Sequence, residues 1–169
     1  MKIENLRQLF ETELRYTYDC EQKLVKKGLP TMISNATSPE LRSALEEHLE
    51  ETRNHITRLD RVFSIVGSEA KTEDNDVLDE ITSSAKDMID DIKVDSVRDA
   101  AIIVGGNKVE HYEMAIYGSL AAFAQQLGFT EAASLLEETL EEEKTADAKL
   151  TQIAESLVNT QASQQRRVA

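Results

Sequence analysis

Apolar residues recur at intervals of three and four along most of the chain, the spacing that places side chains on one face of an α-helix. The first run of this pattern spans about 3–35, and we expect Gly28 and Pro30 to bend or interrupt it. A second run ends at Val66, where Gly67 can adopt the left-handed conformation that terminates helices. The pattern therefore predicts two long helices that form a hairpin.

The turn between these two helices has two candidate caps. Thr37 and Glu40 have the spacing of a capping box, whereas Ser38 would cap a helix whose first residue is Pro39. Both alternatives start the second helix at nearly the same place, so the expected hairpin does not depend on the choice between them.

The second half of the chain repeats this arrangement. A polar loop is followed by a shorter amphipathic segment at about 76–92, a third long helix that ends at Leu127, and a fourth that begins at Thr130. We expect Gly105 and Gly106 to break the third helix, because glycine is a poor helix former. The fold class is therefore all-α: a four-helix bundle with a short additional helix in the long crossover between helices two and three.

An internal repeat relates the two halves. The residues at 49–59 align without a gap with those at 140–150, and leucines, acids and bases recur at equal spacing. Helix-rich sequences also produce such matches by chance, so the repeat gains weight only from the polar positions considered below. If the repeat is structural, the second and fourth helices are counterparts, and a pseudo-two-fold axis relates the two hairpins.

Composition fits one domain of this kind. The chain has 169 residues, with only two prolines and six glycines to interrupt regular structure, which is enough length to bury a core without disulfides. The predicted division is a helical bundle at 1–159 and a disordered C-terminal tail at 160–169.

Charge and cysteine content narrow the expected surroundings. The net charge of -13 repels phosphate backbones, so nucleic acid is not an expected partner. Cys20 is the only cysteine, which rules out an internal disulfide and fits a reducing compartment. No apolar run approaches the ~20 residues that span a bilayer, and the N-terminus has no apolar signal core. We expect a soluble, cytoplasmic protein with no membrane partner.

Acidic residues and a histidine within the apolar stripes are the candidates for chemistry, because charged side chains normally lie on the face opposite the stripe. From the first long helix to the fourth, these candidates are Glu21; Glu51 and His55; Glu110 and Glu113; and Glu143 and Asp147. Residues four apart on a helix point the same way. Buried like charges without partners cost many kcal/mol, and a pair of divalent cations is the usual remedy. The pattern predicts one shared site for two metal ions.

Carboxylate and imidazole ligands suit iron, manganese or zinc, and the lack of thiolate ligands argues against copper(I) and iron–sulfur clusters. His48 shares the face of Glu51, and we expect it beside the ligands rather than among them. Tyr18 and Tyr117 lie one turn from predicted ligands, where they either pack or supply hydrogen bonds or electrons. The alternative interpretation of the acids is a solvated face, since glutamate-rich helices have acids on every side.

The same segments resemble a known family. They are DCEQKLVKKGLP at 19–30, HLEETRNH at 48–55, VRDAAI at 97–102, KVEHYEMAIYGSLAAFAQQLG at 108–128 and ETLEEEKTADAKLTQIA at 138–154. Together they are similar to the YciF/YciE family of ferritin-like bacterial proteins, over nearly all of the chain except its tail. The segment VEHYE is the most specific of them.

This resemblance implies a ferritin-like four-helix bundle, a homodimer, and an association with stress responses in a family without an established biochemical activity. The wider di-iron superfamily takes a glutamate from each long helix and a histidine from the second and fourth, and the matching residues are Glu21, Glu51, His55, Glu110 and Glu143. Glu113 resembles the extra carboxylate of rubrerythrin-like proteins. Asp147 stands where the fourth-helix histidine is expected, and His55 follows Glu51 at one residue more than the usual spacing.

Two functions follow as alternatives. The first is a carboxylate-bridged di-metal protein, with iron the expected metal and manganese or zinc possible, that reacts with dioxygen or peroxide as a small-molecule oxidant. The second is a non-enzymatic dimeric stress or interaction protein whose metal site is vestigial or empty. The acidic Asp147 and the lack of a cysteine pair for electron delivery favour the second alternative. A mineral-storing cage is not expected.

Overall fold

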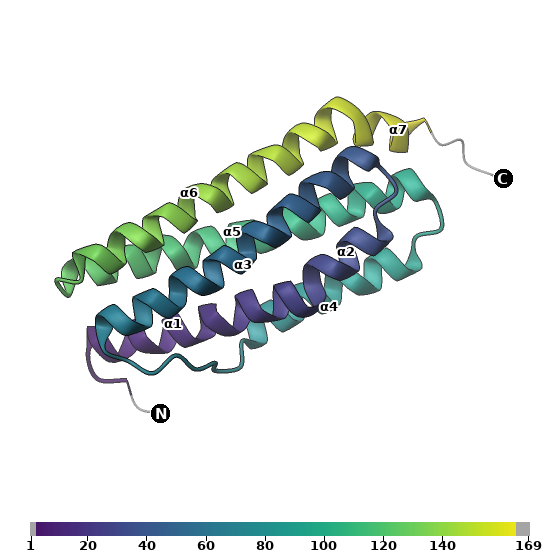
Figure 1. Cartoon of the computed structure of the whole chain (residues 1–169). Coiled ribbons are helices and arrows are strands. Elements are labelled where there is room, and N and C mark those ends of the chain that lie inside the picture. Colours follow the sequence, from purple (N-terminus) through teal and green to yellow (C-terminus); the bar gives the residue numbers. More distant parts are fainter. Residues whose placement is uncertain (1–2, 165–169) are drawn as a thin grey trace.

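The computed structural model describes residues 3–164, and all regular structure within this range is helical. Figure 1 shows long, roughly parallel and antiparallel rods with one shorter helix beside them. In chain order the elements are α1 (Leu6–Lys23), the π-helix η1 (Leu24–Gly28), α2 (Leu29–Asn35), α3 (Pro39–Val66), α4 (Asp76–Asp91), α5 (Asp95–Gln126), α6 (Thr130–Ile153), the π-helix η2 (Ala154–Val158) and α7 (Asn159–Ser163). The predicted all-α four-helix bundle with a short helix in the crossover is confirmed.

The first rod contains a wide turn rather than a break. The N–H of Leu29 donates to the carbonyl of Leu24, five residues earlier, so η1 joins α1 to α2 without leaving helical geometry. Pro30 follows at once, and its ring has no N–H and would crowd a normal α-helical turn. The expected disturbance near Gly28 and Pro30 is therefore present as a π-helical turn.

The tight turn before α3 is held by a buried acid from α5. The hydroxyl of Ser38 accepts a hydrogen bond from the N–H of Leu41 at 3.3 Å, so Ser38 is the cap. The Thr37 alternative is wrong, because the Thr37 hydroxyl and N–H both donate to the carboxylate of Asp99, at 2.6 and 2.7 Å. The N–H of Ser38 donates to the same carboxylate at 2.9 Å. Asp99 thus ties the first hairpin to the second.

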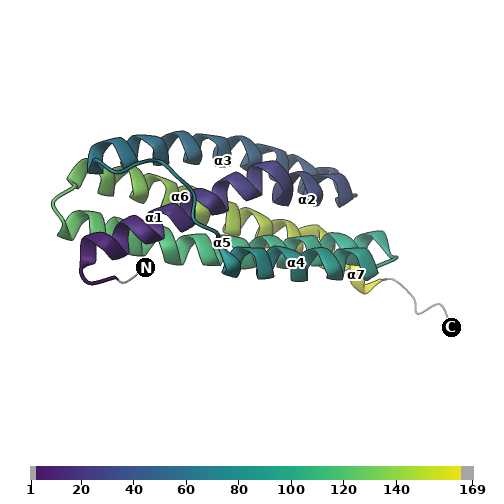
Figure 2. The same ribbon diagram turned by 90° about the horizontal axis from the view of Figure 1, so that it is seen from below.

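The connection from α3 to α4 crosses the outside of the first rod, as Figure 2 shows. It leaves α3 through Gly67, whose φ of 68° is left-handed. At its far end the N–H of Asn75 donates to Asp19 at 3.0 Å, and the Asn75 amide donates to the Tyr112 hydroxyl at 2.7 Å. Asn75 also caps α4, which then packs along α5.

Helix α5 continues through both of its central glycines, so the predicted break is wrong. A Cβ on Gly106 would lie 2.7 Å from Leu150 Cδ1, and one on Gly105 would lie 3.1 Å from the Cβ of Ala85. Side chains of α6 and α4 pack directly against these two glycines, so an added Cβ would have to displace Leu150 or Ala85. The packing outweighs the helix propensity that glycine loses.

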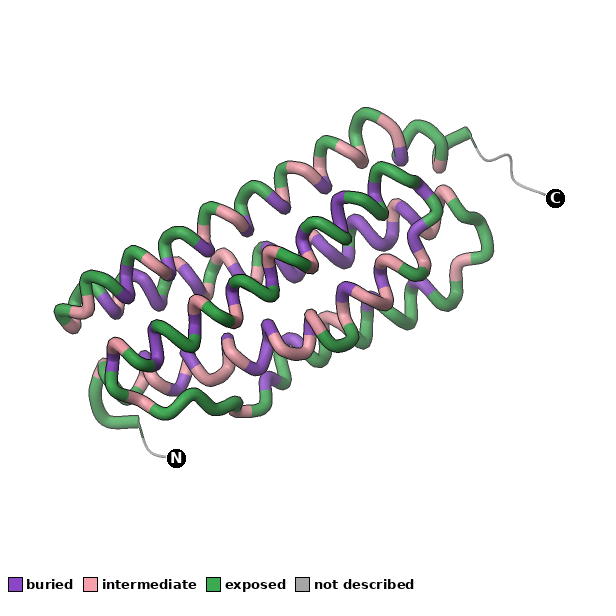
Figure 3. The backbone as a smooth tube through the Cα atoms, in the orientation of Figure 1, coloured by how far each residue is buried: buried purple, intermediate pink, exposed green. Residues whose placement is uncertain are grey.

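Two apolar clusters fill the bundle, one on each side of its middle. Phe10, Leu14 and Phe63 belong to one cluster, and Met32 and Ile102 to the other. Along every long helix the buried stripe passes from one cluster to the other, and Figure 3 shows these buried faces turned inward. The residues between the two clusters are the polar ones, which places the candidate site at the centre of the bundle.

The last rod extends beyond the predicted end of the bundle. Residues 160–163, predicted as disordered tail, belong to α7, which follows the buried Val158 without interruption. The buried Val158 side chain packs into the core and fixes this end of the helix. The remainder of that predicted tail at 165–169 lies outside the described residues.

Within residues 3–164, no helix is both long enough and apolar enough to cross a membrane.

Candidate metal centre

The middle of the bundle contains a cluster of acids and imidazoles with almost no exposed surface. Its members come from all four long helices and are Glu21, His48, His55, Glu110, Glu113 and Glu143, each at most 6 % exposed. The apolar clusters on either side shield them from water along the bundle axis. Such a concentration of ionisable groups in a core is unusual unless the groups are paired or bind metal.

One part of the cluster gathers around the imidazole of His48. Its Nε2 lies 3.3 Å from Glu110 Oε1 and 3.7 Å from Glu143 Oε2. Together with Glu113, these residues offer four ligand atoms that all lie within 4.8 Å of one another. One cation could therefore touch all four.

A second part gathers around the imidazole of His55. Its Nδ1 lies 3.1 Å from Glu143 Oε1 and 3.5 Å from Glu21 Oε1. These three residues again offer ligand atoms within 4.8 Å of one another. Glu143 belongs to both groups and points one oxygen at each histidine, which is the geometry of a carboxylate that bridges two cations.

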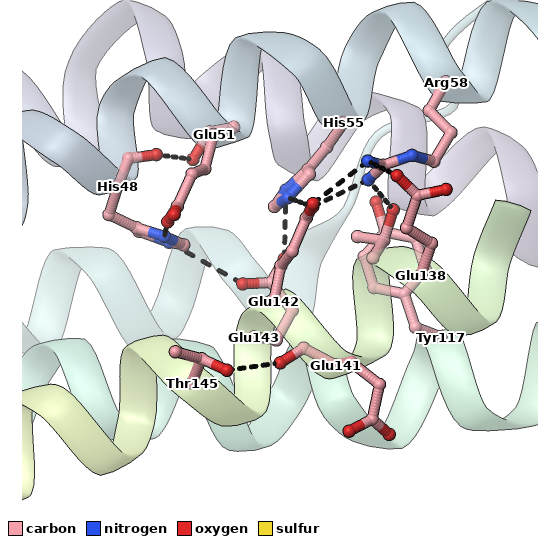
Figure 4. Close-up of polar contacts among 12 residues, drawn as sticks. His48, Glu51, His55, Arg58, Tyr117, Glu138, Glu141, Glu142, Glu143 and Thr145 are labelled. Carbon is pink, nitrogen blue, oxygen red and sulfur yellow. Dashed lines mark hydrogen bonds and ion pairs between the residues drawn. The ribbon is translucent and has the colours of Figure 1, made fainter.

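Each histidine also has an outer carboxylate on its second nitrogen. His48 Nδ1 lies 3.3 Å from Glu51 Oε2, and His55 Nε2 lies 2.8 Å from Glu142 Oε2. Arg58 in turn donates to Glu142 at 2.7 Å. Figure 4 shows both imidazoles reaching from α3 toward α6, with these partners around them. A carboxylate in this place fixes the ring's orientation and leaves its other nitrogen free to bind a metal.

Two further donors touch the acids from within the core. The buried hydroxyl of Tyr117 donates to Glu21 Oε1, and the buried thiol of Cys20 lies 3.5 Å from Glu113 Oε1. Tyr18, the other candidate tyrosine, instead donates to Asp60 outside the site at 2.7 Å. Of the two tyrosines, Tyr117 supplies a hydrogen bond to the cluster and Tyr18 does not.

The electrostatics of the cluster are those of crowded buried acids. Burial raises the pKa of Glu110 and of Glu113 well above its usual range, and the charge of Glu143 adds to both shifts. Burial lowers the pKa of His55, but the close negative carboxylates of Glu143 and Glu21 outweigh this effect and bring the pKa to about 11. The same balance brings the pKa of His48 to about 9. Protons thus compensate the negative charge where no cation does.

Unsatisfied atoms show that the donor set fits a metal. Several fully buried atoms have no hydrogen-bond partner: Glu21 Oε2, His55 Nδ1, Glu110 Oε2, Glu113 Oε2 and both oxygens of Glu143. The contacts of His55 Nδ1 are at ion-pair distance but are not aligned as hydrogen bonds. Buried polar atoms are nearly always satisfied in folded proteins, and these belong to the two groups that share Glu143. Bound cations would supply the missing partners.

The structure brings together most of the predicted ligands but not all of them. Glu21, His55, Glu110, Glu113 and Glu143 converge. Glu51 is 38 % exposed at the side chain and lies outside both groups, on the far nitrogen of His48. Asp147 is also outside, because its carboxylate turns toward His111 Nε2 at 3.3 Å. His48, expected beside the ligands, is among them. Glu142 and Arg58 were not anticipated as partners of the site.

A four-helix bundle with one long crossover and with carboxylates and imidazoles projecting into its middle is the arrangement of ferritin-like proteins. The chain belongs to the family described as a domain of unknown function, DUF892, whose model matches residues 5–163.

Among proteins of the family, Protein YciF of Escherichia coli K12 is 38 % identical over 163 residues, which cover 96 % of this chain and 98 % of YciF. The crystal structure of E. coli YciF, described as a stress protein, superposes with a TM-score of 0.88 over 93 % of this chain and 99 % of that one. YcfI of Rhodopseudomonas palustris, described as a structural protein, is also 38 % identical and has a TM-score of 0.86, covering 89 % of this chain and 95 % of its own.

Proposed function

We propose that the protein is cytoplasmic and binds two iron ions in the core of its bundle. We further propose that the loaded centre reacts with dioxygen or peroxide under stress. The description of E. coli YciF as a stress protein supports the setting. The reaction itself is proposed from the donor set, since carboxylates and imidazoles are the ligands of non-haem iron and manganese.

The observation that carries the proposal is the position of Glu143. Its two oxygens face different histidines, both oxygens are buried, and neither has a hydrogen bond. An acid in a core normally accepts hydrogen bonds, and a single cation would leave one of the two groups without a metal. Two cations that share Glu143 would satisfy both groups.

The residues around the centre have distinct tasks in this proposal. Metal ions held by such ligands supply redox chemistry toward oxygen species. His48 and His55 would each present one neutral nitrogen inward, because Glu51 and Glu142 hold the other nitrogen. The Tyr117 hydroxyl donates a hydrogen bond to Glu21 and would hold that carboxylate in place as a ligand. The apolar clusters exclude water from both ends.

Metal stoichiometry tests the proposal directly. Protein purified without chelator, stripped and then titrated with Fe²⁺ under argon or with Mn²⁺, should bind two equivalents. Glu143→Gln should bind fewer than one, because it alters the residue that both groups share. Glu137→Gln, an exposed change on the same helix, should match wild type. Wild type that binds no metal, or Glu143→Gln that still binds two equivalents, would overturn the two-metal centre.

Turnover needs its own measurement, since binding alone does not establish it. The iron-loaded protein should consume peroxide faster than the same iron in buffer, and Glu143→Gln should lose that difference. Full iron binding without any added consumption would leave a metal protein without this reaction.

An interaction role is the second candidate, favoured by exposed apolar side chains on the outer helix. Val77 and Met88 of α4 are 56 % and 47 % exposed and, at eleven residues apart, face the same way. We propose that this face takes part in a homodimer. Light scattering should show a dimer for wild type and a monomer for the Val77→Ser, Met88→Ser double variant; an unchanged dimer would place the interface elsewhere.

A further inference from the structure

A small cavity leads from the surface to the buried cluster between α3 and α6. Its volume is about 50 Å³, and its lining includes Glu47, His48, Glu51, Glu110, Thr145 and Lys149. Two of these residues, His48 and Glu110, belong to the group of four candidate ligands. The cavity therefore connects to the centre rather than lying apart from it.

The lining changes from exposed to buried along the way inward. The side chains of Glu47 and Glu51 are 59 % and 38 % exposed, whereas those of His48 and Glu110 are 7 % and 3 % exposed. Glu110 Oε2 is buried without a hydrogen-bond partner. A cation that arrives at the outer acids would thus find an unsatisfied buried oxygen at the inner end.

An ion pair lies at the mouth of this cavity. Lys149 of α6 pairs with Glu47 of α3, and no other partner of the Lys149 ammonium is recorded among the described residues. Its side chain is 43 % exposed. An exposed pair of this kind contributes little stability and opens readily.

The internal repeat supplies a counterpart of this ion pair farther along the same two helices, α3 and α6. Moving each residue by the 91 positions that separate 49–59 from 140–150 turns the pair of Lys149 with Glu47 into a pair of Arg58 with Glu138, and that pair is present at 2.7 Å. It likewise turns Glu51 into Glu142. The two ion pairs therefore occupy equivalent positions of the internal repeat.

The counterpart pair is held far more firmly. Arg58 is only 13 % exposed and donates to Glu138, Glu142 and Thr139, each at 2.7 Å. Its planar guanidinium links several acceptors at once, which a lysine ammonium on a flexible stem does less well. The pair at Arg58 is thus fixed by several hydrogen bonds, whereas the pair at the cavity, Lys149 with Glu47, is a single exposed contact.

We infer that metal ions and the oxidant reach the centre through the opening beneath Lys149, between α3 and α6, and that the Lys149–Glu47 pair controls this passage. The inference rests on the proposed metal function and adds a route and a size limit to it. A volume of about 50 Å³ holds roughly three water-sized particles at ~15 Å³ each. Cations, dioxygen and peroxide fit, and organic substrates do not.

The rate of metal loading tests this route apart from binding. Stripped protein is mixed with Co²⁺ in a stopped-flow instrument, and the visible absorbance of bound cobalt reports loading. Lys149→Ala removes a positive charge and the lid, and it should speed loading about threefold or more, with a weaker effect at high salt. Lys149→Arg keeps the charge but can bridge Glu47 and Glu51, as Arg58 bridges its acids, and it should slow loading.

Lys144 provides a matched control on the same helix. It is also exposed and paired with a single acid, Glu141, but it does not line the cavity. Lys144→Ala and Lys144→Arg should load at the wild-type rate. All variants should reach the same final cobalt stoichiometry and the same cobalt-induced rise in melting temperature.

The outcomes separate the route from the function. Full loading of wild type with identical rates in both Lys149 variants would overturn the route and leave the metal centre intact. Equal acceleration by Lys144→Ala would overturn it as well, since the effect would then be one of overall charge. Wild type that binds no cobalt at all would instead refute the proposed function on which the inference rests.

Discussion

Neutralising Glu110 gives opposite results with and without metal. The residue is 2 % exposed, it belongs to the His48 group, and one of its oxygens has no partner. Glu110→Gln keeps the volume but replaces an anionic ligand with a neutral amide. With metal present the change should weaken binding, and without metal it should be close to neutral or stabilising.

The metal-free expectation follows from the pKa of Glu110. Burial raises this pKa well above its usual range, more than the nearby His48 lowers it. The raised pKa favours the neutral carboxyl, so a neutral amide in its place loses less charge interaction than it would at an exposed acid. Relief of crowding with Glu143 works in the same direction.

The metal-loaded magnitude comes from linkage. A site filled at a hundred times its Kd stabilises the fold by about 2.7 kcal/mol. A tenfold loss of affinity removes about 1.4 kcal/mol of this, and complete loss removes all of it. For a chain of this size each kcal/mol moves Tm by ~2–4 °C, so the Tm of loaded Glu110→Gln should fall by about 3–10 °C relative to loaded wild type.

Thermal melts in four arms measure this difference: wild type and Glu110→Gln, each stripped and each with Mn²⁺. Glu46→Gln, an exposed change on α3, controls for the loss of one surface charge. If Glu110→Gln melts higher than wild type even with metal supplied, the reasoning is refuted, because relief of charge crowding would then be the only effect of the change.

Three further changes probe the scaffold and the site. Asp99→Ala should lower the free energy of unfolding by about 2–4 kcal/mol in urea, since the Thr37 turn loses its acceptor; a loss below 1 kcal/mol would show that water replaces it. Gly106→Ala should cost about 1 kcal/mol, because crowding against Leu150 outweighs the gain in helix propensity, and a gain in stability on denaturation would contradict this. Glu142→Gln should lower the affinity for one of the two Mn²⁺ ions by about 10–100-fold in a titration. An equal loss of affinity for both ions would be inconsistent with a residue that contacts only one of the two histidines, His55.

The sequence pattern was sufficient to predict the fold, because the spacing of the apolar residues and the positions of the helix-ending residues indicate the same helices. The apolar stripes, Gly67 and the polar loop define the long helices without any tertiary information. Patterning failed at Gly105 and Gly106, where propensity indicated a break. The close approach of α4 and α6 to α5 decides that region, and this distance is a tertiary property that no local window contains.

The candidate site was predictable to the level of which residues face inward. Five predicted ligands converge because their places in the apolar stripes fix their direction. Glu51 and Asp147 share those directions only approximately, and their final partners depend on rotamers and on neighbours from other helices. Asp147 is drawn to His111, a contact between helices that spacing along one helix cannot reveal.

The internal repeat already indicated that Glu51 is not a direct ligand. Matching Glu51 to Glu143 by their spacing from the next polar residue overlooked this. In the gapless alignment Glu51 corresponds to Glu142, not to Glu143, and both residues hold the outer nitrogen of a histidine. The counterpart of Glu143 is Thr52, which cannot act as an anionic ligand. The repeat therefore assigns Glu51 the same supporting place as Glu142.

The same alignment shows that a symmetric scaffold holds an asymmetric centre. Both histidines come from α3, and their counterparts on α6 are Thr139 and Ala146. Around His48 the candidate ligands include three carboxylates, whereas around His55 they include two, with Glu143 common to both. More anionic oxygen favours harder and more highly charged cations. The two positions are therefore chemically unequal, and the one nearer the Lys149 opening, which contains His48 and Glu110, is also the more acidic.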